Sequence, residues 1–553
     1  MQKHLLLWPI PAIYVMWLIV ICIYGVNIPV LDQWSMPGKQ IESFFENRLD
    51  FTTLYEQHNE SRMVFPNLIF VFLTYMLKTW NVKAEMLVGL GFAFLMSLFI
   101  YLLLLLTNSS FYKNISLLIV YNLCLLSPSS FSRWLRGITI HRLIPDACII
   151  INALVFRLNI NAKLKVLLFS ISCVIAQFSF SGGIIVWPVT LLFVISINKI
   201  TLVEKLKLVF VFIALFIISS SLYFTNYTYP PYHSAPSSIL NYSFKDITIY
   251  IFSFCGNIFG YSPESSMIVG FVLITAFTGL LIVNLKRTRE QKLIPWIGLG
   301  LYTIALGVID TITRLPMSSN NALRVDYITH LAYLPLSILV IFLYTIKYNK
   351  NIILKWIALT LTGAILTFYL MKNSPNKIIL GLQEWQHTYS YGKSCIQLVS
   401  FYEKDDCIKI LFPVLEVVTK RFSKLSELNI LQPGIVKELK FSSQGEWGYI
   451  DSIKKEPINE YFKINGWAKI LERPADAIVL AFTSENQGLT IVGVLPTGET
   501  RTDVSHLYGF RYLNTGWSGS VYLKNNFNIS NIKAYGFDAN TNILYPLKGP
   551  ISF

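Results

Sequence analysis

Repeated apolar runs of about twenty residues dominate the first two thirds of this chain. An α-helix rises 1.5 Å per residue, so a run of this length matches the hydrocarbon core of a bilayer. The 553-residue chain has a mean hydropathy of +0.52, and 14% of its residues are charged. Soluble domains carry roughly a quarter charged residues. The pattern therefore predicts a polytopic α-helical membrane protein.

We predict eleven membrane spans, and their ends are approximate. They lie at about 5–26, 86–106, 115–128, 145–157, 166–179, 182–198, 206–224, 265–284, 292–312, 328–346 and 353–371. The first run is long enough to span and lacks a small-residue cleavage site, so we expect no cleaved signal. The apolar stretch Val64–Trp80 is short and begins Val-Phe-Pro-Asn, which favours an interfacial or re-entrant helix.

Basic residues gather in alternate loops between the predicted spans. By the positive-inside rule these loops face the cytoplasm, with the N-terminus, while the C-terminal domain and the loop after the first span face outside. The net charge of +15 therefore sets topology and does not indicate nucleic acid. The basic loops carry Lys113, Arg157, Lys163, Lys165, Lys199, Lys205, Lys207, Lys286, Arg287, Arg289, Lys292, Lys347, Lys350 and Lys355.

The composition changes near residue 373. We expect a membrane domain over 1–372, whose outer loop covers 27–85, then a mixed linker and helical segment over 373–440. The segment 441–553 has short alternating strands and many turns, which predicts an extracytoplasmic all-β, sandwich-like domain. Expected strands are Tyr461–Trp467, Ala477–Phe482, Gly519–Leu523 and Ile532–Phe537. Cys395 and Cys407 could pair if this part faces an oxidising compartment; the sequence leaves that open.

The loop after the first span contains most of the acid, base and phosphate-binding chemistry of the membrane half. Asp32 lies beside Trp34 just past that span, and His58, Glu60 and Arg62 follow at alternate positions. These three side chains share one side if the segment is extended. A carboxylate here could be a general base or a ligand for a hard divalent cation, and an arginine could bind phosphate. A solvated charge at a helix end is the plain alternative for Asp32.

Other outer loops hold weaker candidates. Arg136 and His141 lie in a loop that also carries Arg133 and Arg142, and these arginines could bind a lipid phosphate or only face headgroups. His141 could equally be a packed histidine. Arg324 and Tyr327 belong to the last outer loop, where Arg324 and Asp326 could form a structural ion pair. No Walker loop, dinucleotide fingerprint, zinc spacing or nucleophile elbow is present in the sequence.

This arrangement resembles the GT-C superfamily of polytopic membrane glycosyltransferases. The similar features are the early acid in Val30-Leu-Asp-Gln-Trp34, the segment His58-Asn-Glu-Ser-Arg-Met-Val-Phe-Pro66, and the many spans. It looks closest to bacterial GT-C-like membrane proteins that have a C-terminal β domain. Their Gly-Trp-Ala and Arg-x-Asp-Val motifs are similar to Gly466-Trp-Ala468 and Arg501-Thr-Asp-Val504.

The resemblance implies an inverting transfer of sugar from a polyprenyl-phosphate donor to an envelope glycan or lipid acceptor. The reaction would occur at the outer face of a bacterial inner membrane. Asp32 would be the base, beside a divalent cation such as Mg²⁺ or Mn²⁺ if one is needed. The phosphate and substrate contacts would be His58, Glu60, Arg62, Arg136, His141, Arg324 and Tyr327. Rival hypotheses are a lipid-linked glycan transporter or flippase, and an O-antigen polymerase- or ligase-like protein.

Overall fold

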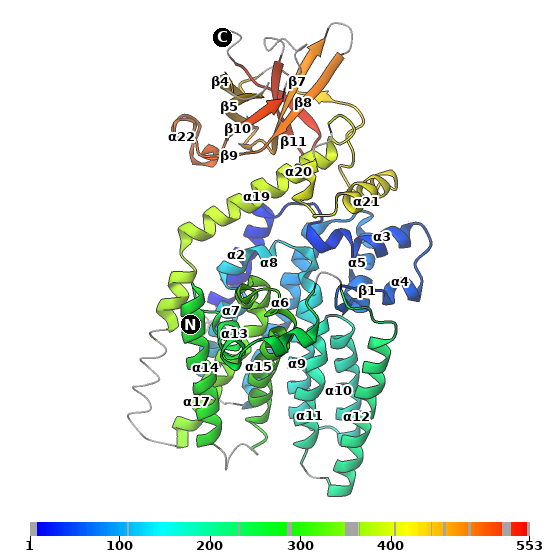
Figure 1. Cartoon of the computed structure of the whole chain (residues 1–553). Helices are drawn as coiled ribbons and strands as arrows, with labels where there is room; N and C mark the ends of the chain where they lie inside the picture. The colour runs from blue at the N-terminus through cyan, green and yellow to red at the C-terminus, as the bar shows by residue number, and fades with distance from the viewer. Residues whose placement is uncertain are drawn as a thin grey trace. The chain divides into compact units, whose positions relative to one another are not determined.

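A computed structural model gives the fold of the chain (Figure 1). It describes residues 8–107, 110–198, 200–230, 233–284, 290–348, 363, 365–402, 405–443, 445–456, 461–484, 488–522 and 532–549. The chain divides into two compact units. The first comprises 1–23, 50–69 and 85–378, and the second comprises 24–49, 70–84 and 379–553. Two segments of the long outer loop thus belong to the same unit as the C-terminal part.

The first unit is helical. Seven helical stretches are long and apolar enough to cross a membrane among the described residues. Their length follows from long runs of apolar sequence. They are Val82–Thr107 (α6), Phe111–Trp134 (α7, η2 and α8), Gly137–Arg157 (η3 and α9), Leu202–Phe224 (α12), Pro263–Val283 (α14), Ile294–Arg314 (α15) and Val325–Ile346 (η7, α16 and most of α17).

Seven of the predicted spans correspond to these helices, and the count of eleven stays a prediction. Three apolar helices are shorter: Pro9–Tyr24 (α2), Val64–Leu77 (α5) and Ser181–Ile195 (η4 and α11). The run at 166–179 lies in the 16-residue helix Ala162–Gln177 (α10). The span at 353–371 falls largely on 349–362 and 364, outside the described residues.

One helix was not expected from the sequence. Phe244–Gly256 (α13) lies in the segment Thr225–Glu264, which reads as a Tyr- and Pro-rich loop. Ser243 begins the helix because its side chain accepts the N–H of Asp246 and the carboxylate of Asp246 accepts the N–H of Ser243. The helix packs closely on α14: a Cβ at Gly270 would fall 1.8 Å from the Phe252 carbonyl oxygen. Tertiary packing therefore stabilises a helix whose sequence has a weak apolar pattern.

The first unit also contains a small hairpin and a row of neighbouring helices. Gln57–His58 (β1) pairs antiparallel with Ser61–Arg62 (β2), after the short helix Phe51–Tyr55 (α4). The segment 57–62 therefore turns at Asn59 and Glu60 and is not one extended strand. Beyond it, α9, α10, α11 and α12 run alongside one another (Figure 1).

The second unit joins part of the outer loop to the C-terminal helices. Leu31–Trp34 (η1) and Gly38–Phe45 (α3) pack on Leu415–Glu427 (α21). Trp34 is fully buried, and its ring lies 6.1 Å from that of Trp80 and 6.2 Å from that of Phe422. Aromatic contacts of this kind contribute beyond the burial of area. The remaining helices are Pro375–Gln397 (α19), Asp405–Lys409 (α20) and Thr502–Tyr508 (α22), and a disulfide joins Cys395 to Cys407.

Two five-stranded sheets follow in the C-terminal part. One has the order β4-β5-β10-β9, with β6 paired to β5, and the other has the order β3-β12-β11-β7-β8. The strands expected at 461–467, 477–482 and 532–537 are present, and Gly516–Tyr522 covers the fourth apart from Leu523. The bounds are Lys440–Phe441 (β3), Gly448–Lys455 (β4), Tyr461–Ile470 (β5), Arg473–Pro474 (β6), Ala477–Ser484 (β7), Gly488–Leu495 (β8), Thr497–Glu499 (β9), Gly516–Tyr522 (β10), Ile532–Asp538 (β11) and Ile543–Pro546 (β12).

A single apolar core draws on both sheets. Ile464 and Trp517 enter it from β5 and β10, and Leu480 and Ala534 enter it from β7 and β11. Alternate residues of each strand point to one face, so the period-two pattern of the sequence supplies the inward positions. Trp517 is fully buried, so its ring packs within this core and is not exposed at the surface.

Candidate functional site

Four arginines of the first unit surround one carboxylate, that of Asp326. Arg136 forms a buried ion pair with Asp326, and Arg324 Nη2 lies 3.0 Å from the second carboxylate oxygen. Arg133 donates to the backbone carbonyl of Asp326, and Arg142 is a further electrostatic neighbour. We call Arg133, Arg136, Arg142, Arg324 and Asp326 the arginine cluster.

The ends of three candidate spans supply this cluster. Arg133 ends the helix Phe131–Trp134 (α8), and Arg142 lies in the first turn of Ile140–Arg157 (α9). Asp326 lies in the single turn Val325–Tyr327 (η7) that leads into the last described span. The chain therefore places guanidinium groups where apolar helices end, which is where a lipid headgroup would meet them.

Several guanidinium nitrogens of the cluster are buried without a hydrogen-bond acceptor among the described residues. They are Nε and Nη2 of Arg133 and Nη1 of Arg142. Arg142 otherwise rests against the rings of Phe180 and Tyr327, at 5.1 and 5.4 Å from their centroids. An unpaired buried donor on a charged group costs more than a neutral one. The arrangement therefore favours an anion with several acceptor oxygens.

A second buried carboxylate lies beside the cluster. Tyr250 donates to Asp310 Oδ2 at 2.7 Å, and Tyr327 also hydrogen bonds to Asp310. Tyr327 thus touches both the carboxylate of Asp310 and the guanidinium of Arg142. The structure places Tyr327 near Arg136 and Arg324, which were predicted with it. The role of Tyr327 as a substrate contact stays a prediction.

A buried acid–imidazole pair lies deeper along the same helices. His330 Nδ1 is 2.7 Å from Asp146 Oδ1, and Tyr302 donates to the same oxygen at 3.1 Å. Both members of the pair are almost fully buried. Asp146 Oδ2 and His330 Nε2 have no hydrogen-bond partner among the described residues. An ionisable pair inside an apolar span is a functional-site candidate by default.

Glu60 forms a compact ion-pair group at the surface of the first unit. Arg314 pairs with one carboxylate oxygen, and His233 Nδ1 lies 3.2 Å from the other. Burial alone would raise the pKa of the Glu60 carboxyl, but the neighbouring His233 and the positive charge of Arg314 outweigh it and lower the pKa to about 2. Glu60 is therefore ionised at neutral pH and is a poor proton acceptor.

Arg62 connects separate segments of the first unit by hydrogen bonds to their backbone carbonyls. Its Nε and Nη1 donate at 2.7 Å to the carbonyls of Tyr223 and Tyr55, and Nη2 donates to that of Thr225. Three of its five N–H donors therefore bind backbone carbonyls, and its phosphate-binding role stays a prediction. His58 lies beside Asn59 on the other side of the hairpin turn, so His58, Glu60 and Arg62 do not share one face.

His141 and Asp32 occupy different surroundings. His141 is buried, its Nδ1 faces the Ile138 carbonyl, and Arg142 Nε donates to its Nε2 at 3.2 Å. It therefore helps to orient an arginine of the cluster. Asp32 belongs to the second unit, where it is exposed on the turn η1 and its backbone carbonyl accepts the N–H groups of Ser35 and Met36.

The fit of a divalent cation can be tested on the donors present. Among the residues that the structure describes, no group of three His, Cys, Asp or Glu side chains could hold a metal ion.

The arginines were predicted from the sequence as site residues, but several acidic and histidine side chains near them were not. Asp146, Asp310, His233 and His330 were not among the predicted site residues. A carboxylate in the middle of an apolar run, as at Asp146, is the signal that could have found the first of these. The partners of Asp310 come from helices far apart in the sequence, so no local pattern shows them.

Comparison with known proteins identified no relative of this chain. No protein-family model matches it, and no curated protein or solved structure shows significant similarity to it.

Proposed function

We propose that this chain is a membrane glycosyltransferase that moves a sugar from a polyprenyl-phosphate donor to a glycan or lipid acceptor of the cell envelope. The observation that carries the proposal is the arginine cluster, whose Arg133 and Arg142 present buried donors without acceptors at the ends of candidate spans. Arginine suits this role because its planar fork binds phosphate oxygens in pairs.

The chemistry of the proposed transfer follows from two kinds of group. Asp32 takes the proton of the acceptor hydroxyl, whose oxygen attacks the anomeric carbon of the donor sugar. The bond between that carbon and the phosphate oxygen breaks, and its electron pair leaves with the phosphate. Guanidinium groups neutralise the charge that develops on this phosphate. The products are an inverted glycosidic bond and the polyprenyl phosphate.

The disulfide supports a location outside the cytoplasm. Cys395 and Cys407 are paired, and such bonds persist mainly in oxidising compartments. This agrees with the topology that the basic loops predict, in which the C-terminal part faces the exterior of a bacterial inner membrane.

A lipid-binding experiment tests the phosphate site without catalysis. The purified chain in detergent is heated with farnesyl phosphate or with farnesol, which differ only in the phosphate. We expect the phosphate to raise the melting temperature more, Arg142→Gln to lose that difference, and Arg142→Lys to retain part of it. Arg48→Gln, at an exposed arginine, should behave as wild type. Equal stabilisation by both lipids in the wild type would refute the site.

A transfer assay tests the reaction. Membranes containing the chain receive polyprenyl-phosphate sugars, and transfer to endogenous acceptors is measured. Loss of the base in Asp32→Asn should lower the rate about 100-fold or more, because general base catalysis contributes at least that much. Asp503→Asn, which alters an exposed aspartate, serves as the matched control. Equal transfer by wild type and Asp32→Asn would remove Asp32 from the mechanism.

A transporter of lipid-linked sugars is the second candidate, and one observation favours it. The Asp146–His330 pair lies buried inside candidate spans, where proton-coupled transporters keep such groups. In proteoliposomes, this hypothesis predicts that wild type moves a fluorescent lipid-linked sugar across the bilayer and that Asp146→Asn stops it. Transfer activity without any such movement would reject it.

A further inference from the structure

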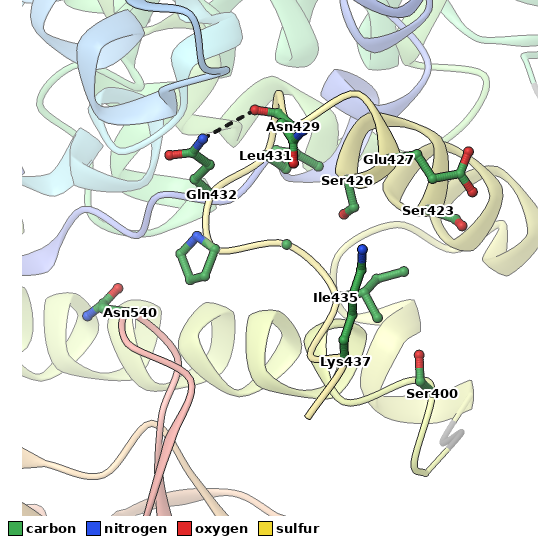
Figure 2. Close-up of a pocket in the computed structure, with 12 residues that line it drawn as sticks. Ser400, Ser423, Ser426, Glu427, Asn429, Leu431, Gln432, Ile435, Lys437 and Asn540 are labelled. Carbon is green, nitrogen blue, oxygen red and sulfur yellow. Dashed lines mark hydrogen bonds between the residues drawn. The ribbon is translucent and has the colours of Figure 1, made fainter. Parts of the chain in front are cut away.

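The second unit contains a pocket, and none of the residues that line it belongs to the arginine cluster. Its volume is about 810 Å³, within the range of small-molecule sites. The helix α21 supplies Ser423, Ser426 and Glu427, and the following loop supplies Asn429, residues 431 to 435 and Lys437 (Figure 2). Ser400 and Asn540 complete the lining from the end of the α19 region and from the turn between β11 and β12.

Hydrogen bonds fix the loop that forms this pocket. Gln397 Nε2 donates to the carbonyls of Pro433 and Ala539 at 3.1 and 3.0 Å, and the Gln397 carbonyl accepts the N–H of Val436 at 2.9 Å. One side chain of α19 thus holds the loop against the strand region. A wall fixed in this way loses little conformational freedom when a ligand binds.

The turn at Asn429 and the position of Asn540 are fixed as well. Asn429 has a φ of +58°, a region that asparagine tolerates, and its carbonyl accepts from Gln432 Nε2 at 3.4 Å (Figure 2). Lys393 Nζ donates to Asn540 Oδ1 at 2.9 Å. This leaves the amide nitrogen of Asn540 as the group available for a ligand.

One lining hydroxyl lacks a partner. Ser426 Oγ is buried and has no hydrogen bond to any described residue. Gly434 faces it so closely that a Cβ there would lie 2.9 Å from Ser426 Oγ. The lack of a Cβ at Gly434 therefore allows the loop to lie this close to Ser426.

The lining identifies the class of ligand. Half of the twelve lining residues carry a hydroxyl or a carboxamide: Ser400, Ser423, Ser426, Asn429, Gln432 and Asn540. These groups both donate and accept hydrogen bonds, as sugar hydroxyls do. Glu427 and Lys437 carry opposite charges, so the lining has no net charge to select an ion. Leu431, Pro433 and Ile435 offer apolar surface for the C–H faces of a sugar ring.

We infer that this pocket binds a neutral oligosaccharide. The inference does not depend on the transfer reaction, because it concerns only binding by the residues that line this pocket. A glycan held here would be either a carbohydrate acceptor or the saccharide part of a lipid-linked donor; both present the same hydroxyl chemistry.

Binding of sugars to the whole chain tests this inference. The labelled full-length chain in detergent is applied to an array of neutral, acidic and basic oligosaccharides, and positive members are titrated in solution. We expect binding to one or more neutral members and an affinity at least tenfold lower in Ser426→Trp, which fills the pocket. Lys420→Trp places the same ring on an exposed position of α21 outside the lining and should bind as wild type.

The outcomes separate the alternatives. A second variant, Ser426→Ala, removes only the hydroxyl and should weaken binding without filling space, so misfolding of the tryptophan variant cannot explain both results. Competition by the free glycan and by its lipid-linked form distinguishes the two sources. Absence of binding to every neutral member, binding of charged members only, or equal binding by Ser426→Trp and wild type would overturn the inference. The Asp32→Asn variant should bind normally, so failure of the proposed reaction leaves this test intact.

Discussion

The carboxylate of Glu60 stabilises the folded first unit through Arg314 and His233, which lie on segments far from it in sequence. Replacement in Glu60→Gln leaves a half-buried arginine without its counter-charge. We expect a loss of about 1–3 kcal/mol in the free energy of unfolding, measured by thermal or denaturant unfolding of the purified chain. Glu438→Gln makes the same chemical change at an exposed side chain and should have little effect.

The pH dependence of this contribution has a defined sign. The pKa of Glu60 falls from its ordinary value near 4.5 to about 2 in the folded chain. The folded state therefore binds fewer protons between these values than the unfolded state. The contribution is complete above pH about 4.5 and is lost as the pH falls towards 2. Unfolding curves of wild type and Glu60→Gln should converge over this range; a constant difference would contradict the assignment.

Lys393 is a buried cation whose lowered pKa makes stability rise with pH in a second, alkaline window. Burial lowers its pKa to about 8, and the carboxylates of Asp476 and Asp538 offset only part of that effect. Since the unfolded lysine titrates near 10.5, the folded state holds fewer protons between pH 8 and 10.5, and stability rises with pH in this window. Lys393→Met should lack the rise, which hydrogen exchange of α19 amides would show. Lys420→Met, at an exposed lysine, should retain it.

At the scale of elements, one arginine joins α21 to the segment after the first helix. Arg421 Nε lies 2.9 Å from Glu42 Oε2, and its Nη1 donates to the carbonyls of Trp34 and Ser35. Gly38 makes room for this side chain, because a Cβ there would lie 2.9 Å from Arg421 Cδ. The position of η1, and of Asp32 on it, therefore depends on α21.

Removal of this arginine should loosen η1 and α3. Arg421→Leu leaves two carbonyls and the carboxylate of Glu42 without their donor, so we expect faster hydrogen exchange over residues 31–45. Arg421→Lys should rescue little, because an ammonium group does not reproduce the guanidinium fork. Arg48→Leu, at an exposed arginine, is the control. Unchanged exchange in Arg421→Leu would show that aromatic packing around Trp34 suffices.

At the scale of the whole molecule, the testable property is the side of the membrane on which each part lies. The alternating basic loops and the Cys395–Cys407 disulfide both favour a C-terminal part outside the cytoplasm. Alkaline phosphatase fused after Phe553 should therefore be active, and the same fusion after Lys163 should be inactive. The reverse pair of activities, at equal expression, would overturn the topology.

The sequence by itself determined the class of the protein and several of its elements. Long apolar runs can only satisfy their backbone groups in a membrane as helices, so seven candidate spans could be read directly. Alternating residues and turns likewise predicted β5, β7 and β11. Arg136, Arg324 and Tyr327 were found as charged or aromatic residues in outer loops, where ionisable groups are scarce and therefore conspicuous.

Which of these residues contact one another depends on the tertiary structure. It showed that Arg62 supports carbonyl groups, that Arg314 pairs with Glu60 from a distant helix, and that Asp326 lies among four arginines. It also placed residues 24–49 in one unit with the C-terminal part. A local sequence pattern determines the periodicity and length of a helix or strand. A hydrogen bond or ion pair between distant segments depends instead on tertiary packing, which no single stretch of sequence specifies.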